Sequence, residues 1–539
     1  MHPAPLSALW RDGEDLHQNT LRIARRVSAL TIPHIVPPDG HQEGEEFLDP
    51  YSSIGGRGLN NLSSKLLLTL FPPQASPFIY EVDKAALIEQ FPDEAGAPDA
   101  EIRAKLELAE RERVVNKYWS TSGFRPVMYE TIRHLLVAGV SVFKLYRDGT
   151  APRLFKLPQT QVRRDGQGNW DRVIIREMVY VRDLKPEVVA LLPPNSNRDP
   201  SDKVDLWTCV KDVSNSDDPM YKGIKWYVWQ EIEDGVVLEH TVEKFKNDAD
   251  CPWVVVGSGA VAGEHYGRAI CAEFLGDLRS VEGLAQAIVE GAAIASQVRM
   301  LVDPGAGVTP RELALSANGA YLKGRNGGVE AVSLNKGADF GVANTVMNSI
   351  EQRLQLAFLM NTAVRRDAER VTAAEIRFIA EELESSQGGL FSGMADQIQN
   401  PVVLKTDAIL VRRKDLTALP KGLASPKIVS GLDAIGRGQD RARLRTFAQD
   451  AQAVIGVEQF AAIVNTPAWM AELALADGLD PTTLIKSEEQ RAAEAQAAQQ
   501  QQTAESLGPN AIQAVSQALS SGNVDPQAIM AQLAQLQQR

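Results

Sequence analysis

Apolar residues recur every three or four positions in three long stretches of the chain, and this spacing predicts amphipathic helices. The first stretch covers residues 100–118 and alternates with Glu, Lys and Arg. The second begins near residue 272 and carries a single apolar stripe: Leu278, Val281, Ala285, Ile288, Ala292 and Ala295. The third covers about residues 338–360. We therefore expect long helices from residue 272 onward.

The second and third of these helices contain residues suited to close packing. Gly283, Gly291 and Ala292 lie in the second helix, and such small side chains let a neighbouring helix approach. Val346 and Ile350 belong to the apolar ladder of the third helix. These five residues are our candidates for helix packing.

Strand patterns dominate an earlier part of the chain. Residues 173–181 and 225–242 are rich in β-branched and aromatic side chains and are bounded by turn sequences such as Asp165-Gly166 and Asp234-Gly235. Residues 193–218, between them, are rich in Pro, Asn, Asp and Ser, which predicts an exposed loop. Strands and helices together indicate an α+β protein that is mainly helical.

A compact insert, residues 302–337, separates the second and third helices. Its sequence Thr309-Pro310-Arg311-Glu312 predicts a capping box, with Pro at the first helical position. Lys323 and Arg325 add positive charge, and a solvated surface is the simpler explanation for both.

A short basic loop follows the third helix. It holds Arg365, Arg366 and Arg370 and leads into a second capping box at Thr372, where another long helix is expected. After Pro420 the chain becomes rich in Ala and Gln, which favours helix or disorder.

Charge and hydropathy limit the possible functions. The 539 residues carry a formal net charge of −13, which argues against a protein that coats nucleic acid, because affinity for phosphates comes from Lys and Arg. No apolar run approaches the roughly 18 residues of a membrane span. The first eleven residues lack a secretory signal, so we expect synthesis in the cytoplasm and no membrane partner.

One glycine-rich pattern raises the possibility of an enzyme. Gly257, Gly259 and Ala262 fit the G-x-G-x-x-A fingerprint of dinucleotide-binding proteins, and the apolar residues 253–256 precede them. That fingerprint should open a helix and be followed by a second strand ending in an acid about 20 positions later. Residues 277–298 are predicted to be helical instead, so a plain turn is the preferred interpretation. A nucleotide-binding enzyme remains the alternative.

Other signs of catalysis or cofactor binding are missing from the sequence. The seven histidines show no metal-binding spacing, and Cys209, Cys251 and Cys271 are too far apart for a metal clip and read as buried thiols. Phosphate-binding GxxxxGK[ST] and GxSxG motifs are absent. We therefore expect no enzymatic activity, no cofactor and no metal.

Four stretches together resemble the portal, or head-to-tail connector, family of short-tailed bacteriophages. They are residues 56–72 (Gly-Arg-Gly-Leu-Asn-Asn-Leu-Ser-Ser-Lys-Leu, ending Leu-Phe-Pro), residues 266–280 (Tyr-Gly-Arg, then Leu-Gly-Asp-Leu-Arg-Ser), residues 370–377 (Arg-Val-Thr-Ala-Ala-Glu-Ile-Arg) and residues 431–440 (Gly-Leu-Asp-Ala-Ile-Gly-Arg-Gly-Gln-Asp). Each stretch alone is modest, but their order and span make a chance match very unlikely.

The resemblance implies a portal fold with a wing, stem, clip and crown, assembled as a ring of about twelve copies. It implies the following segments: residues 1–270 as a wing region with strands, 271–300 as the first stem helix, 301–337 as the clip, 338–363 as the second stem helix, 364–430 as the tunnel loop and long wing helix, and 431–539 as the crown and a helical barrel.

The resemblance also implies a function and partners. Double-stranded DNA would pass through the ring during genome packaging and ejection. Further partners would be the major capsid protein, a tail adaptor, internal core or scaffolding proteins and a terminase motor. The expected location is the portal vertex of the virion, after assembly in the host cytoplasm.

The basic loop falls where the family places the constriction of the tunnel. Identical loops from every copy would make a local contact with backbone phosphates, which carries no base information. We therefore predict that Arg365, Arg366 and Arg370 form this constriction. The alternative is that these arginines pair with nearby acids such as Asp367 or Glu375. Lys323 and Arg325 are weaker candidates for the tunnel mouth.

Overall fold

The computed structural model describes residues 5–42, 44–72, 76–83, 100–192, 199–233, 235–259, 263–296, 299–317, 319–332, 337–360, 393–420, 422, 424–428, 436–456, 459–460, 464, 469–470 and 473. The chain divides into two compact units, Met1–Gly436 and Arg437–Arg539. Among the described helices, none combines the length and the hydropathy that a bilayer span requires.

The larger sheet of the first unit is antiparallel and has the order β4-β5-β6-β7-β8, with β9 also paired to β7. Its strands are β4 (Thr160–Arg164), β5 (Trp170–Tyr180), β6 (Lys203–Asp212), β7 (Trp226–Ile232), β8 (Val236–Val237) and β9 (Glu243–Phe245). Trp207 and Trp229 lie in a cluster of buried residues that also contains Leu6 and Trp10 from the N-terminal helix α1 (Leu6–Asp12). Burial of these large rings fixes the sheet against the start of the chain.

The prediction of an exposed loop over residues 193–218 was wrong in its second half. Strand β6 lies between β5 and β7, and its residues Trp207, Cys209 and Val210 are buried. Composition misled the prediction, because flanking Pro, Asn, Asp and Ser masked an apolar strand of ten residues. The strand pattern of residues 225–242 was correct but is divided into β7 and β8 by a turn.

Two smaller sheets complete the strands of the body. The order β10-β2-β3 joins β10 (Trp253–Gly257), β2 (Val140–Lys144) and β3 (Arg153–Phe155), and β1 (Phe78–Val82) pairs with β13 (Ala424–Ile428). All of these pairs are antiparallel. A dinucleotide-binding βαβ unit requires parallel strands, and the next helix after β10 begins only at Ile270. The Gly257 pattern is therefore a turn after a strand, as preferred.

The helices of the first unit are α1, α2 (Glu14–Leu30), α3 (Ile54–Leu70), α5 (Ala100–Thr121), α6 (Phe124–Ala138), α7 (Pro186–Val189), α8 (Ile270–Glu273), α9 (Leu275–Ser296), α10 (Pro310–Leu315), α11 (Gly337–Ala357) and α14 (Asn400–Arg412). The main core gathers around α3 and α6, where Leu62 and Leu135 are fully buried. Each such side chain contributes about 1.5–3 kcal/mol by leaving water. The α+β class is confirmed, with helices in the majority.

Gly139 ends α6 at a point of close backbone approach. Its φ of 77° is in the left-handed region, and a Cβ there would lie 2.2 Å from the carbonyl oxygen of Gly267. Only glycine fits this position without moving the backbone. The contact holds the Tyr266-Gly267-Arg268 motif against the end of α6.

The second unit contributes helix α16 (Gly436–Ile455) to the described residues. Beyond it, Phe460 is buried and makes an edge contact with Trp469, with ring centroids 6.4 Å apart.

Candidate functional site

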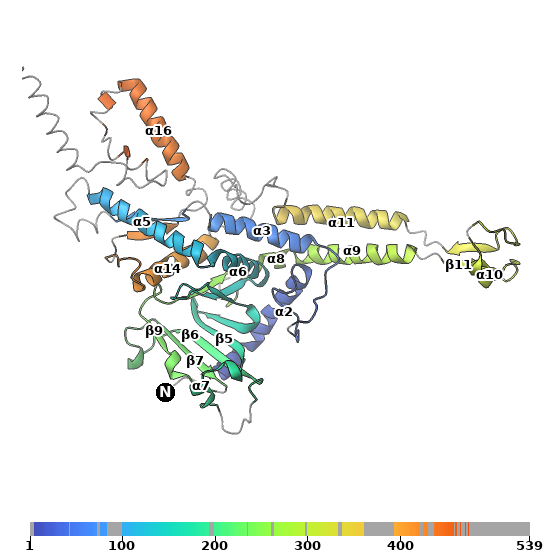
Figure 1. Cartoon of the computed structure of the whole chain (residues 1–539), viewed down its shortest axis with the longest axis horizontal. Coiled ribbons are helices and arrows are strands. Elements are labelled where there is room, and N and C mark those ends of the chain that lie inside the picture. Colours follow the sequence, from blue (N-terminus) through green and yellow to red (C-terminus); the bar gives the residue numbers. More distant parts are fainter. Residues whose placement is uncertain are drawn as a thin grey trace, which may run out of the picture. The chain divides into compact units, whose positions relative to one another are not determined.

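Helices α9 and α11 form an antiparallel pair and lie side by side in Figure 1. Near the start of α9, Asp277 Oδ1 accepts a hydrogen bond of 2.9 Å from Arg353 Nη2, near the end of α11. Toward the other end, Gly291 faces Phe340 so closely that a Cβ would lie 2.5 Å from the ring. The predicted helices are thus present, and α11 ends three residues before the predicted boundary at residue 360.

The five residues proposed for helix packing occupy different environments. Ile350 is 8% exposed and packs in the main core, and Gly291 contacts Phe340 within the same chain. Gly283, Ala292 and Val346 are exposed in the isolated chain, and a Cβ at Gly283 would meet no atom within 4 Å. The first two residues hold α9 and α11 in place, whereas the other three lie on open surface.

One open face of α9 consists of small residues. Gly276, Ser280, Gly283 and Ala287 are all exposed, and their spacing places them on a single side of the helix. On α11, Val342, Val346 and Leu356 share a face by the same spacing and are 66%, 45% and 64% exposed. Exposed apolar side chains in such a row are typical of a surface that another protein covers.

The insert between α9 and α11 forms a hairpin with a short helix. Strand β11 (Arg299–Val302) pairs antiparallel with β12 (Val329–Val332), and α10 begins with the predicted capping box. Thr309 Oγ1 accepts a hydrogen bond from Glu312 N, and the Glu312 carboxylate accepts one from Thr309 N. This confirms the local prediction made from the Thr-Pro-Arg-Glu sequence.

The tip of the insert is both apolar and basic. Leu315 and Tyr321 are 77% and 103% exposed, which leaves their whole side chains in water in the isolated chain. Lys323 and Arg325 are exposed beside them. The Arg325 backbone is ordered by a hydrogen bond from its N–H to the carbonyl of Ala306. The tip therefore offers a firm surface with apolar and positive groups together.

The C-terminal end of α11 is held by α3. Phe358 is fully buried against Gly58, and Leu359 is 5% exposed. Asn61 Nδ2 donates to the carbonyl oxygens of Phe358 and Leu359 at 2.9 and 3.0 Å, and Lys65 Nζ donates to that of Leu359 at 2.7 Å. Sequence reasoning missed this junction, because nothing local links α3 to residues almost 300 positions away.

The predicted constriction residues Arg365, Arg366 and Arg370 lie outside the described residues, as does the capping box at Thr372. The described chain reaches Met360, so the α3–α11 junction ends five positions before the first of these arginines. The junction is therefore the part of the site whose geometry is known.

The three cysteines are free and buried, as predicted. Burial raises the pKa of the Cys251 thiol to about 11 and that of Cys271 to about 12, and it also raises the pKa of Cys209. A thiol with a raised pKa is a poor nucleophile near neutral pH. Within the described residues, no group of His, Cys, Asp and Glu is arranged to hold a metal ion.

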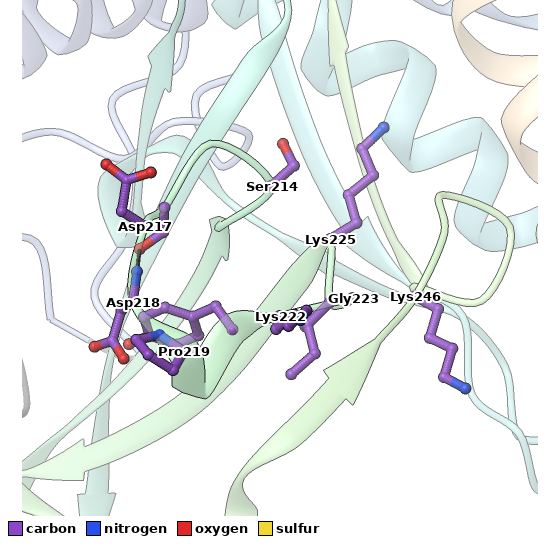
Figure 2. A pocket seen from close by; sticks show the side chains of 11 residues that line it. Ser214, Asp217, Asp218, Pro219, Lys222, Gly223, Lys225 and Lys246 are labelled. Atoms are coloured by element: carbon purple, nitrogen blue, oxygen red, sulfur yellow. Dashed lines mark hydrogen bonds between the residues drawn. The ribbon is translucent and has the colours of Figure 1, made fainter.

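An open depression lies beside the loop between β6 and β7, and Figure 2 shows the side chains around it. Lys222 and Lys246 are exposed, whereas Lys225 Nζ pairs with Asp248 at 2.6 Å. Asp218 accepts a hydrogen bond from Met220 N and so belongs to the turn itself. Since the charges are mixed and largely solvated, we assign no ligand to this depression.

Comparison with known proteins identifies relatives over most of the chain. The family described as "Bacteriophage head to tail connecting protein" matches residues 5–485. The chain is 34% identical to the portal protein of Enterobacteria phage T3 over 87% of its own length and 86% of that protein. It is 32% identical to the portal protein of Escherichia phage T7, with 87% and 85% covered, and no relative found supports the enzyme alternative.

A chain from the virion of a native gene transfer agent particle is also similar, at 12% identity and a TM-score of 0.33, with 78% of this chain and 100% of that chain covered. At so low a score the two backbones agree only loosely.

Proposed function

This chain belongs to the family of bacteriophage head to tail connecting proteins, as a portal protein of the short-tailed type, and from that membership we propose that its copies form a ring that conducts DNA. The similarity to portal proteins over 87% of the chain carries the proposal. Double-stranded DNA would pass through the ring when the genome is packaged and when it is ejected.

We assign the parts of the chain to this ring as the resemblance suggests. Residues 1–270 would form the wing, α9 and α11 the two stem helices, the insert between them the clip, residues 364–430 the tunnel loop and long wing helix, and residues 431–539 the crown and barrel. The exposed faces of α9 and α11 would then be covered by adjacent copies, because a closed ring of identical chains must bury a surface on each copy. About twelve copies are expected.

The net charge of −13 suits a conduit better than a binder. A duplex must move along the ring, and each contact between a phosphate and a Lys or Arg adds affinity that resists movement. Acidic walls avoid that resistance. Arg365, Arg366 and Arg370 would then provide a localised contact with the backbone of the duplex, and Lys323 and Arg325 would lie at the tunnel mouth.

The further partners follow from the same assignment. The ring would sit at the portal vertex of the virion and contact the major capsid protein, internal core or scaffolding proteins and a tail adaptor. Since the thiols are buried and the described residues hold no metal cluster, we propose that ATP hydrolysis and force come from a terminase motor.

The test replaces Arg365 and Arg366 by Ala in the full chain. We expect rings of unchanged mass, and packaged heads that lose DNA or fill poorly, because the phosphate contact is gone while the stem is intact. The measurements are native mass spectrometry of the rings and the DNA content of heads. Lys222→Ala with Lys246→Ala is the matched control, since it removes the same charge from the solvated depression of Figure 2.

Full heads and normal infectivity in the arginine variant would contradict the assignment of the constriction. Loss of DNA in the lysine control as well would show that total charge, not the basic loop, decides retention.

A further inference from the structure

Helix α11 ends in a turn that normally requires glycine. Met360 N–H donates to the carbonyl of Gln355 at 2.7 Å and Leu359 N–H to that of Leu356 at 3.1 Å, which is the pair of hydrogen bonds of a Schellman motif. Leu359 occupies the left-handed position of this motif with a φ of 53°. Because a β-carbon is unfavourable in that conformation, surrounding contacts must hold Leu359 in place.

Those contacts come from a different helix. The last carbonyl groups of a helix lack partners within the helix, and the carbonyls of Phe358 and Leu359 lie just beyond the end of α11. Asn61 and Lys65, one turn apart on α3, donate to both of them over 2.7 to 3.0 Å. Lys65 is 6% exposed, and its positive charge lies at the negative end of the α11 dipole.

A third residue of α3 shapes the same contact. A Cβ at Gly58 would lie 2.6 Å from ring atoms of Phe358 and 3.0 Å from its Cβ, so any larger residue pushes the end of α11 away. Gly58, Asn61 and Lys65 are three and four positions apart and therefore share one face of α3. Together they form what we call the α3 cap.

We propose that the α3 cap positions the basic loop by fixing the point at which the chain leaves α11. Asn61 and Lys65 are then positioning residues for Arg365, Arg366 and Arg370, although they touch no DNA. This inference rests on the proposed function of those arginines. It adds that the long-range hydrogen bonds of α3, and not the stem alone, determine where the basic groups stand in the ring.

The experiment weakens the cap without enlarging any side chain. Asn61→Ala removes two hydrogen bonds, and Lys65→Met removes the charged one while keeping most of the apolar stem. We expect amide exchange at residues 358–360 to accelerate about 10- to 100-fold, because a hydrogen bond to a charged group lowers the opening equilibrium by about that factor. Retention of DNA per intact ring should fall toward that of the variant lacking Arg365 and Arg366.

Two controls separate positioning from general damage. Asn60→Ala changes the same residue type one position away, where the side chain is exposed and accepts one bond of 3.2 Å from Tyr129; it should leave both measurements unchanged. Lys65→Arg keeps a cationic donor and should restore DNA retention more fully than Lys65→Met. A purely structural residue would alter melting temperature without this difference between Arg and Met.

The outcomes distinguish the two proposals. Unchanged exchange at residues 358–360 in both cap variants overturns the cap. Faster exchange with normal DNA retention, in a system where the arginine variant loses DNA, overturns the positioning role and leaves the proposed function intact. If the arginine variant itself retains DNA normally, the constriction is wrong and the positioning role is overturned with it.

Discussion

His17 joins the first helices of the chain to the Tyr266 motif. Its side chain is fully buried, and its Nδ1 lies 3.2 Å from Tyr266 Oη, which also accepts a 3.4 Å hydrogen bond from Val162 N. The tyrosine hydroxyl therefore donates to Nδ1, so the proton of neutral His17 is on Nε2, beside the ring of Trp10. Burial, assisted by the charge of Arg25, lowers the pKa of His17 to about 4.

A pH dependence of stability follows from this shift. Between pH 6.5 and about 4 the unfolded chain binds a proton at His17 that the folded chain does not, so stability is full above this interval and falls as the pH drops through it. We expect a loss of about 2 kcal/mol from this residue at pH 5. Urea unfolding at pH 7.5 and 5.0 measures it.

His17→Gln is the informative variant, because glutamine does not titrate. The difference between the two pH values should shrink by that amount. An unchanged difference would mean that His17 is not neutral at pH 5 only because of folding. His134, whose pKa burial lowers to about 3, should still contribute acid sensitivity in this variant.

At the scale of elements, the two glycines of α9 separate two roles that the sequence could not distinguish. Gly291 contacts Phe340 of the same chain, so Gly291→Leu would disturb the α9–α11 pair itself. Gly283 faces open space, so a larger side chain there reaches only what covers the helix from outside.

Gly283→Leu is therefore expected to leave each chain folded and to reduce rings to smaller assemblies. Leucine is a better helix former than glycine by about 1 kcal/mol, so the isolated helix gains stability while the contact with the adjacent copy is blocked. Native mass spectrometry and circular dichroism measure the two effects.

Gly341→Leu is the matched control on α11. Gly341 is also exposed, with no atom within 4 Å of its would-be Cβ, and its helical position is separate from the row of Val342, Val346 and Leu356. Intact rings with Gly283→Leu would exclude the small-residue face of α9 from the assembly contact.

The sequence predicted elements better than it predicted their partners. Helices α5, α9 and α11 were found because apolar spacing over many turns is a strong local signal. Strand β6 was missed because its neighbours in the sequence resemble a loop, and its identity depends on burial between β5 and β7. The contact of Lys65 with Leu359 joins residues 294 positions apart, which no local pattern reveals.

At the scale of the whole molecule, charge is the property that the proposed ring must use. The chain has 69 acidic and 56 Lys and Arg residues, so most of its surface repels a duplex. Each phosphate contact contributes a slope of about −0.9 to the dependence of log affinity on log salt concentration. A ring that holds DNA through a few loops should therefore show a shallow dependence.

We expect release of DNA from isolated rings to depend weakly on salt between 50 and 200 mM, and the slope to approach zero when Arg365 and Arg366 are replaced by Ala. Fluorescence anisotropy of a labelled duplex at several salt concentrations measures the slope. A steep slope that the replacement leaves unchanged would place the phosphate contacts on other residues.

The buried thiols make the chain convenient for spectroscopy. Cys209, Cys251 and Cys271 are enclosed and weakly acidic, so maleimide dyes at neutral pH should leave them unmodified. A cysteine introduced in place of the fully exposed Tyr321 would react alone. Energy transfer between dyes on different copies would then report distances across a working particle from the natural cysteine background, with no stabilising mutations needed beforehand.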